Sequence, residues 1–278
     1  MPTFRGSRPE DLLIKSDGRI VPPFMSAEPS LFPVRASTIY PAPPNGADIL
    51  FHCEGDRGGT YYCKGDHSGR QIRATEWFFT HLAHHVGFAT PECAIVERRD
   101  ANTSFFGSRQ IASPASAMEL HNLLMTPQRG ELGQPSSWPG AYLSQLYAFD
   151  LFAGNWDRSI QNFLLQNEGF TRRLCVFDFA SCSLEGLAAI KFPVASDPTV
   201  RIGKFLRLRH GFFPKAAIEM IDRLAAIPAE TITRFLSLMP DDWMSAEQKE
   251  SICELWSKHQ IASRLAALRS GLGDESLL

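Results

Sequence analysis

Short apolar runs separated by turn residues fill the chain between residues 34 and 112. Glycine and proline stand in the joints PAPPNG and EGDRGG, which is typical of turns between strands. After the third run, RATEWFFTHLAHHVGF instead repeats its apolar residues at helical spacing, and Gly87 is a suitable helix end. The pattern predicts a small antiparallel sheet with one helix after its third strand. The predicted strands are 34–40, 47–53, 60–65, 90–99 and 104–112.

Segments with helical periodicity dominate from about residue 113 onward. YLSQLYAFDLFAG (142–154) predicts a helix that follows Pro139 and ends at Gly154. NFLLQ and RRLCVFDF, separated by the turn NEG, predict a β-hairpin. In the rest of the chain, the spacing of apolar residues predicts helices at about 215–227, 229–239 and 245–271.

The change from strands to helices predicts an α+β fold built of two lobes. Residues 34–112 form the predicted small lobe, and residues 113–278 form the larger, mostly helical lobe. Residues 1–33 contain many prolines and predict an extended arm. The boundary near 110–118 is expected to act as a hinge, and clefts between such units often bind ligands.

The composition argues against several classes of protein but identifies no binding partner. The 278 residues are 44% hydrophobic and 21% charged, with a net charge of -2 and no basic block, so nothing points to nucleic acid. The N-terminus does not resemble a secretory signal, and no apolar run reaches membrane-spanning length. We therefore expect a cytoplasmic protein without membrane contact. The six cysteines form no C-x-x-C pair and are expected to be buried free thiols.

Polar residues interrupt the apolar pattern at GNWDRSIQNFLL. Asp157 follows the predicted helix end, and Asn162 begins the hairpin. Asp178 follows the second hairpin strand, so a folded hairpin would bring it close to Asn162. A carboxylate directly after the apolar run CVF is costly unless it is paired or bound to a metal. Upstream, Lys64 ends the third strand and Glu76 lies in the first turn of the next helix, within reach of Lys64.

This ordered set resembles the catalytic segments of the HipA-like kinases. The similarity lies in GNWDRSIQNFLL with LCVFDFA, in GTYYCKGDHSGRQIRATEWFFTHLAHHVGFATPECAIVE, in SFFGSRQI, and in LMPDDWM before a final helix. A D-R-x-x-x-N pattern is also similar to the phosphatidylinositol kinases. The resemblance spans roughly 34–271 and implies a two-lobed protein-kinase-like fold with ATP-dependent phosphorylation, often of protein serine or threonine.

The resemblance also implies a role for each residue of the set. Asp157 would be the catalytic base, and Asn162 and Asp178 would bind Mg²⁺. Lys64 would hold the ATP phosphates, and Glu76 would pair with Lys64. These roles imply ATP and Mg²⁺ as cofactors and a protein as the acceptor. They are also compatible with a regulatory partner protein.

Two features depart from the family pattern and keep alternatives open. The loop PAPPNGA has a single glycine where a loop that covers phosphates usually offers more free amides, and Ala180 stands after Asp-Phe in place of glycine. A nucleotide-binding pseudokinase that acts by interaction is therefore a second hypothesis. A kinase for a small molecule or a lipid is a third, although no basic or amphipathic membrane patch favours the lipid.

Several neighbouring residues allow more than one interpretation. Asp150 is either an acid that hydrogen-bonds the catalytic loop or a structural acid, and Arg158 either neutralises nearby charge or is solvated. His81 and His85 have the i, i+4 spacing of zinc ligands, but no third ligand is evident, so a polar helix face is favoured. The basic stretch RIGKFLRLRH (201–210) is expected to be a solvated helix face.

Overall fold

The computed structural model describes most of the chain after residue 31. The described residues are 13–15, 20–21, 32–44, 46, 48–101, 103–129, 133, 136–168, 171–257 and 260–278. Most of the predicted arm 1–33, and two positions of the loop PAPPNGA, therefore lie outside the described residues.

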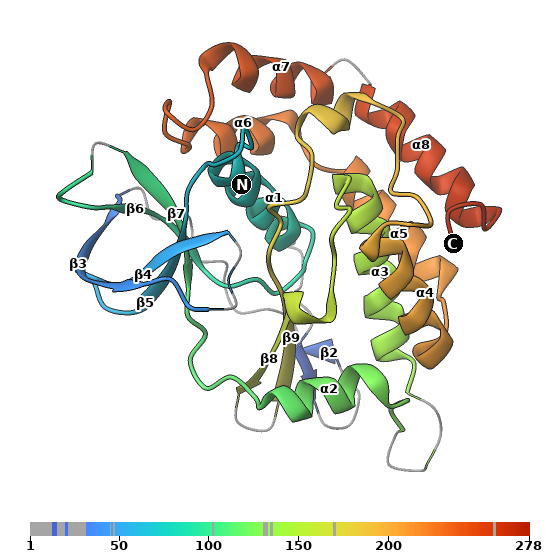
Figure 1. Cartoon of the computed structure of the whole chain (residues 1–278). Helices are drawn as coiled ribbons and strands as arrows, with labels where there is room; N and C mark the ends of the chain where they lie inside the picture. The colour runs from blue at the N-terminus through green and yellow to red at the C-terminus, as the bar shows by residue number, and fades with distance from the viewer. Residues whose placement is uncertain are drawn as a thin grey trace, which may run out of the picture.

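Five strands form a closed barrel in the first part of the described chain (Figure 1). They are β3 (Val34–Pro41), β4 (Ile49–Gly55), β5 (Thr60–Lys64), β6 (Cys93–Glu97) and β7 (Ser104–Arg109), in the spatial order β3-β4-β5-β7-β6. The predicted strands are thus confirmed, but the predicted purely antiparallel sheet is wrong, because β3 closes the barrel by pairing in parallel with β6. Inward side chains such as Phe51, Cys53, Cys63 and Val96 fill the interior.

Helix α1 (Ile72–His85) leaves the barrel after β5 and enters the main hydrophobic core. Trp77, Phe78 and Phe79 are all buried, so apolar contacts surround this helix on several sides. The indole N–H of Trp77 donates to the carbonyl of Phe235, 158 positions later. The helix that carries Glu76 is therefore fixed to both the barrel and the C-terminal helices.

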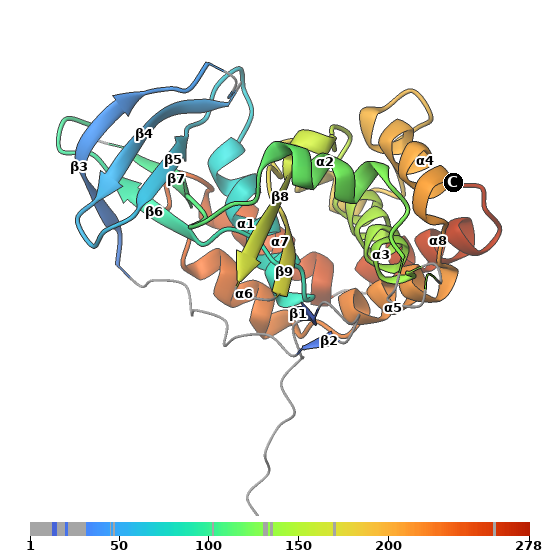
Figure 2. The same ribbon diagram turned by 90° about the horizontal axis from the view of Figure 1, so that it is seen from below.

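The rest of the described chain is mostly helical and includes the predicted hairpin. Strand β8 (Phe163–Glu168) pairs with β9 (Thr171–Val176), and the short strands β1 (Leu13–Lys15) and β2 (Ile20–Val21) extend this sheet along β9. Figure 2 shows this sheet between the barrel and the helices. The helices are α2 (Ala117–Met125), α3 (Trp138–Ala153), α4 (Pro198–His210), α5 (Pro214–Ala225), α6 (Ala229–Ser237), α7 (Ala246–Ser257) and α8 (Gln260–Gly273), with 3-10 turns η1 (Ile160–Asn162) and η2 (Glu185–Ala188).

Some helix boundaries differ from the sequence-based predictions. Helix α3 begins at Trp138, so Pro139 lies in its first turn instead of before it. In the first turn the missing N–H of a proline costs no hydrogen bond. The predicted single helix 245–271 is two helices, α7 and α8. Helix α2 was not predicted, because it buries only two leucines and so shows little helical periodicity. A capping box between Ser116 and Glu119 stabilises its start.

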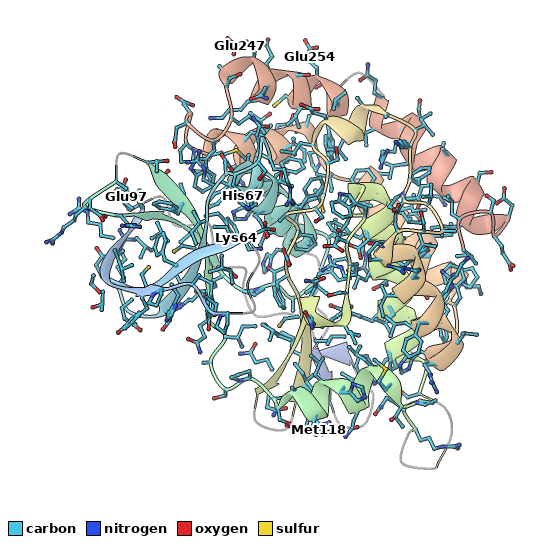
Figure 3. All side chains as sticks on the ribbon, viewed as in Figure 1. Lys64, His67, Glu97, Met118, Glu247 and Glu254 are labelled. Atoms are coloured by element: carbon cyan, nitrogen blue, oxygen red, sulfur yellow. The ribbon has the colours of Figure 1, made fainter. Side chains whose placement is uncertain are left out.

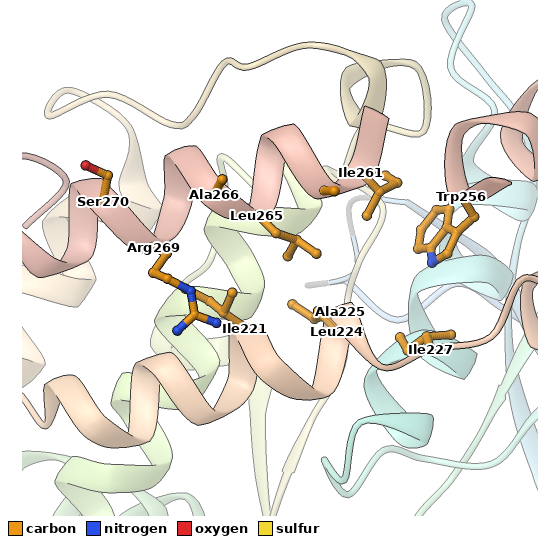
Figure 4. Close-up of a pocket in the computed structure, with 11 residues that line it drawn as sticks. Ile221, Leu224, Ala225, Ile227, Trp256, Ile261, Leu265, Ala266, Arg269 and Ser270 are labelled. Carbon is orange, nitrogen blue, oxygen red and sulfur yellow. The ribbon is translucent and has the colours of Figure 1, made fainter. Parts of the chain in front are cut away.

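The C-terminal helices leave a groove of about 550 Å³ between α5 and α8 (Figure 4). Its floor is apolar and includes Ile221, Leu224 and Leu265, and Trp256 of α7 stands at one end. None of the helices in the described part of the chain is long and apolar enough to span a membrane. All six cysteines are free thiols, and Cys53 and Cys63 lie with their Sγ atoms 3.8 Å apart inside the barrel.

Candidate active site

A buried lysine connects the barrel, helix α1 and the end of the hairpin. The Nζ atom of Lys64 lies 2.5 Å from Oε1 of Glu76 and 2.8 Å from Oδ1 of Asp178. Figure 3 shows Lys64 at the junction of the barrel and the helices. Burial disfavours the charged ammonium, but the two carboxylates outweigh this effect and raise the pKa of Lys64. The predicted contact between Lys64 and Glu76 is therefore present, with Asp178 as a further partner.

Asp178 stands at a sharp turn two residues after the end of strand β9. Its φ of 64° is left-handed, a conformation that aspartate tolerates better than most residues. Its Oδ2 accepts a hydrogen bond of 3.0 Å from Nδ2 of Asn162, and the backbone N–H of the next residue, Phe179, donates to Glu76. Burial raises the pKa of Asp178, but the charge of Lys64 outweighs burial and lowers it. The hairpin thus brings Asn162 and Asp178 together, as the sequence predicted.

A buried ion pair between Asp150 and Arg158 holds the loop that carries Asp157 in place. Helix α3 ends at Gly154, which has a φ of 62°. Asp150, on the last turn of α3, accepts two hydrogen bonds of 2.9 Å from the guanidinium of Arg158, and both side chains are only 2% exposed. Asp150 also accepts from Nδ2 of Asn155. The contact of Asp150 with this loop is confirmed, whereas the interpretation of Arg158 as a solvated arginine is wrong.

Asp157 itself is exposed and faces a cavity of about 680 Å³. Partial burial and the charge of Asp178 raise the pKa of Asp157, whereas the charge of Arg70 lowers it. The walls of the cavity bring all five predicted site residues together, namely Lys64, Glu76, Asp157, Asn162 and Asp178. Apolar side chains also line it, including those of Ile49, Pro91, Phe106, Ile111, Leu164 and Phe177. The cavity therefore has both charged and apolar residues in its walls.

A comparison with protein-family models matches residues 38–271 to the HipA-like kinases. The chain belongs to the HipA-like kinase family. The resemblance drawn from the sequence is thus confirmed over most of the chain.

One solved structure agrees with this assignment at the level of the fold. The crystal structure of the Helicobacter pylori proinflammatory kinase CtkA is similar, with a TM-score of 0.55, 12% identity, and coverage of 87% of this chain and 99% of that chain. HipA in a Shewanella oneidensis MR-1 toxin–antitoxin complex with HipB and operator DNA has a TM-score of 0.46 and 12% identity. That match covers 84% of this chain and 64% of the HipA chain. A comparison with curated proteins found no match.

This HipA-like kinase has oxygen donors that suit a small hard cation. Within the described residues, no group of three or more His, Cys, Asp or Glu side chains is arranged to hold a metal ion. Mg²⁺ does not need such a cage, because it uses one or two protein ligands with water and phosphate oxygens. The carboxylate of Asp178 is partly exposed and the amide of Asn162 lies beside it. The amide oxygen now accepts from the N–H of Ser159, so the amide would turn to present it to a cation.

Two charged residues of the HipA-like kinase were not predicted from the sequence, namely Asp48, which lines the cavity, and Arg70, which pairs with Asp48. Asp48, directly after the loop PAPPNGA, lies 2.8 Å from Nε2 of His67 and 3.5 Å from the guanidinium of Arg70. Arg70 in turn donates to the carbonyl of Ala180, just after Asp178 and Phe179. These contacts connect the loop beside the cavity to the segment that follows Asp178. No motif marks them, because their partners are distant in the sequence.

The three histidines of α1 lie away from this site. His81 packs against Trp77 and Phe235, and burial lowers its pKa to about 4, so it is neutral at physiological pH. Burial also lowers the pKa values of His84 and His85. In the HipA-like kinase these side chains therefore contribute to packing around α1.

Proposed function

We propose that the chain is an ATP- and Mg²⁺-dependent kinase with a two-lobed protein-kinase-like arrangement. It transfers the γ-phosphoryl group to a hydroxyl, and the preferred acceptor is a serine or threonine of a protein. The observation that carries the proposal is the bridge of Lys64 between Glu76 and Asp178, at the edge of a cavity that Asp157 and Asn162 also line.

The mixed lining of the cavity suits a nucleotide. Its apolar side chains suit a purine base, which lacks charge and has two flat faces. Lys64 binds the α and β phosphates, and Glu76 fixes the lysine in a single position. The boundary predicted near 110–118 also reaches the cavity, through Gln110, Ile111 and Pro114. Whether this boundary bends as a hinge stays a prediction.

Asp157 acts as the base that orients the acceptor hydroxyl and accepts its proton. Asp150 and Arg158 fix the loop from the buried side, while the Asp157 side chain stays open to the cavity. Asn162 and Asp178 would hold Mg²⁺, which neutralises phosphate charge as the transfer proceeds. A regulatory partner protein remains part of the proposal.

A direct assay tests the proposed function. Purified protein is incubated with γ-labelled ATP and Mg²⁺, and label is measured on the protein itself, on added proteins and on small-molecule or lipid acceptors. Transfer to protein supports the proposal, and transfer only to a lipid or metabolite would replace the acceptor class. ATP binding without any transfer would favour the pseudokinase alternative, which the single glycine of PAPPNGA motivates.

Asp178→Asn is expected to weaken Mg²⁺-dependent nucleotide binding at least about 10-fold, because a neutral amide is a poorer ligand for a hard cation. Isothermal titration with ATP, with and without Mg²⁺, measures this change. In wild type, Mg²⁺ should strengthen ATP binding, and in the variant this gain should largely disappear. An equal gain from Mg²⁺ in both proteins would contradict the assignment of Asp178.

The pH dependence of transfer is expected to follow the charges around Asp157. A base must be deprotonated, so the rate falls as the pH drops through the pKa of Asp157, which partial burial and Asp178 raise. Arg70 lowers this pKa and Asp48 raises it. Arg70→Gln should therefore move the acid limb of kcat to higher pH, and Asp48→Asn should move it to lower pH. Shifts in the same direction for both variants would contradict this assignment.

A further inference from the structure

Arg73 lies in the first turn of α1, one turn before Glu76, and its side chain is only 10% exposed. Its Nε atom donates to Oδ2 of Asp66 at 2.9 Å, and its backbone N–H donates to the other oxygen of that carboxylate at 2.9 Å. Asp66 lies in the connection between β5 and α1. Arg73 therefore has a local counter-charge, which a mostly buried guanidinium requires.

Asp242 is a second acidic partner of Arg73, and it belongs to the segment between α6 and α7. Its Oδ2 atom accepts from Nη1 of Arg73 at 2.6 Å, and its backbone carbonyl accepts from Nη2 at 3.0 Å. The two residues are 169 positions apart in the sequence. The Asp242 side chain is 48% exposed and does not line the cavity of Asp157. Because Asp66 already neutralises Arg73, the contact with Asp242 adds an attachment between distant parts of the chain.

The segment that carries Asp242 also holds the start of strand β7 (Figure 1). The hydroxyl of Thr103 donates to Oδ2 of Asp242 at 3.1 Å. The indole N–H of Trp243, a residue only 1% exposed, donates to the hydroxyl of Ser104 at 2.9 Å. Arg73 donates to the carbonyl of Ser104, and its guanidinium carbon lies 5.6 Å from the centre of the Trp243 ring. One segment of the helical part therefore binds both the barrel and the first turn of α1.

The position of Arg73 on α1 decides which active-site residue this attachment controls. Residues three positions apart in an α-helix are separated by about 60° around the axis and about 4.5 Å along it, so Arg73 and Glu76 are neighbours on one helix surface. The carboxylate of Glu76 lies 2.5 Å from Nζ of Lys64 and accepts from the N–H of Phe179 at 3.1 Å. A rotation of the first turns of α1 would lengthen these contacts. A misplacement of about 1 Å can lower the rate of an enzyme by about 10²-fold.

We propose that Asp242 is a positioning residue for phosphoryl transfer, which acts through Arg73 to hold Glu76 against Lys64. This inference rests on the proposed kinase function and deepens it, because it assigns part of the geometry of the site to a residue outside the cavity. The hydrogen bond of Trp77 to a distant carbonyl fixes the second turn of α1, and the contact with Asp242 fixes its first turn. Glu76 lies between these two points, so together they set the direction of its side chain.

A double-mutant cycle tests the role of Asp242. Asp242→Ala and Glu76→Gln are made singly and together, and the affinity for ATP with Mg²⁺ and kcat/KM for ATP are measured for each protein. Asp241→Ala is the matched control, because it removes the neighbouring acid, which is exposed and pairs with Lys249. Thermal unfolding of every variant is measured in parallel. Arg73 is left intact, because its loss would leave the carboxylate of Asp66 without its partner.

We expect Asp242→Ala to lower both ATP affinity and kcat/KM for ATP about 10-fold, whereas Asp241→Ala leaves both at the wild-type values. In the Glu76→Gln background, Asp242→Ala should have little further effect on either quantity, because the contact that Asp242 positions is already lost. Independent sites have additive effects, so additive losses would overturn the proposal. A lower melting temperature of Asp242→Ala with wild-type ATP affinity would also overturn it, since that is the result of a purely structural role.

The kinase proposal is judged separately, from Mg²⁺-dependent ATP turnover in wild type against Asp157→Ala. If wild type binds ATP without turnover, the kinase assignment fails, and the cycle in ATP affinity still decides whether Asp242 positions Glu76. If wild type turns over ATP and Asp242→Ala matches it, only the positioning role fails. An equal loss in Asp241→Ala would overturn the positioning role as well, and a wild type without ATP affinity would overturn both proposals.

Discussion

Replacing Asp157 by alanine is expected to lower the rate of phosphoryl transfer by about 10²- to 10⁴-fold, the usual contribution of a general base. The acceptor hydroxyl loses both its orienting partner and the group that takes its proton. The fold should remain intact, because Asp157 is exposed and its recorded hydrogen bond is made by its backbone N–H to Asn155. Initial rates with labelled ATP, together with thermal unfolding of both proteins, measure the two effects.

Asp241→Ala provides a control for the loss of one acidic side chain. Asp241 is exposed, pairs with Lys249, and does not line the cavity of Asp157. An exposed ion pair of this kind contributes little to stability. The control should transfer phosphate at the wild-type rate, with a similar melting temperature. Full turnover in Asp157→Ala, or an equal loss in Asp241→Ala, would remove the evidence for Asp157 as the base.

The candidate site was predictable because its chemistry depends on local sequence patterns. Asp157 and Asn162 stand five positions apart after a helix end, and Asp178 lies one hairpin later. A hairpin brings its two ends together whatever the rest of the fold does. The contact between Lys64 and Glu76 was predictable because it needs only a strand that is followed along the chain by a helix. The sequence did not reveal that Lys64 also contacts Asp178, which depends on how the barrel and hairpin meet.

Long-range contacts could not be predicted in the same way. The barrel closes because Val34 and Arg35 of β3 pair with Val96 and Glu97 of β6, about sixty positions apart. Alternating apolar residues indicate that a strand is half-buried but do not identify its neighbour. Arg264 is an ordinary arginine in the sequence, yet it is buried, because backbone carbonyls from distant segments satisfy its guanidinium group. Arg158 is also buried, through its pair with the nearby Asp150 and a hydrogen bond to the carbonyl of Phe177.

Lys64→Met is expected to abolish ATP-dependent transfer and also to destabilise the protein. Methionine is similar in length but cannot bind phosphate. The carboxylate of Glu76, which pairs with Lys64, is almost completely buried, so removal of the ammonium leaves an uncompensated buried charge. Breaking a buried pair in this way typically costs about 3–5 kcal/mol. Denaturant unfolding measures the loss of stability, and titration with ATP and Mg²⁺ measures the loss of nucleotide affinity.

The double variant Lys64→Met/Glu76→Gln separates the two effects. A neutral glutamine removes the unpaired charge, and its side-chain oxygen can still accept the hydrogen bond from the N–H of Phe179. Stability should therefore recover by a large part of the loss, whereas ATP binding and transfer should stay absent, because no ammonium faces the phosphates. A double variant no more stable than Lys64→Met would show that the buried charge of Glu76 is not the cause of the destabilisation. Recovery of transfer would instead exclude Lys64 as the residue that binds the phosphates.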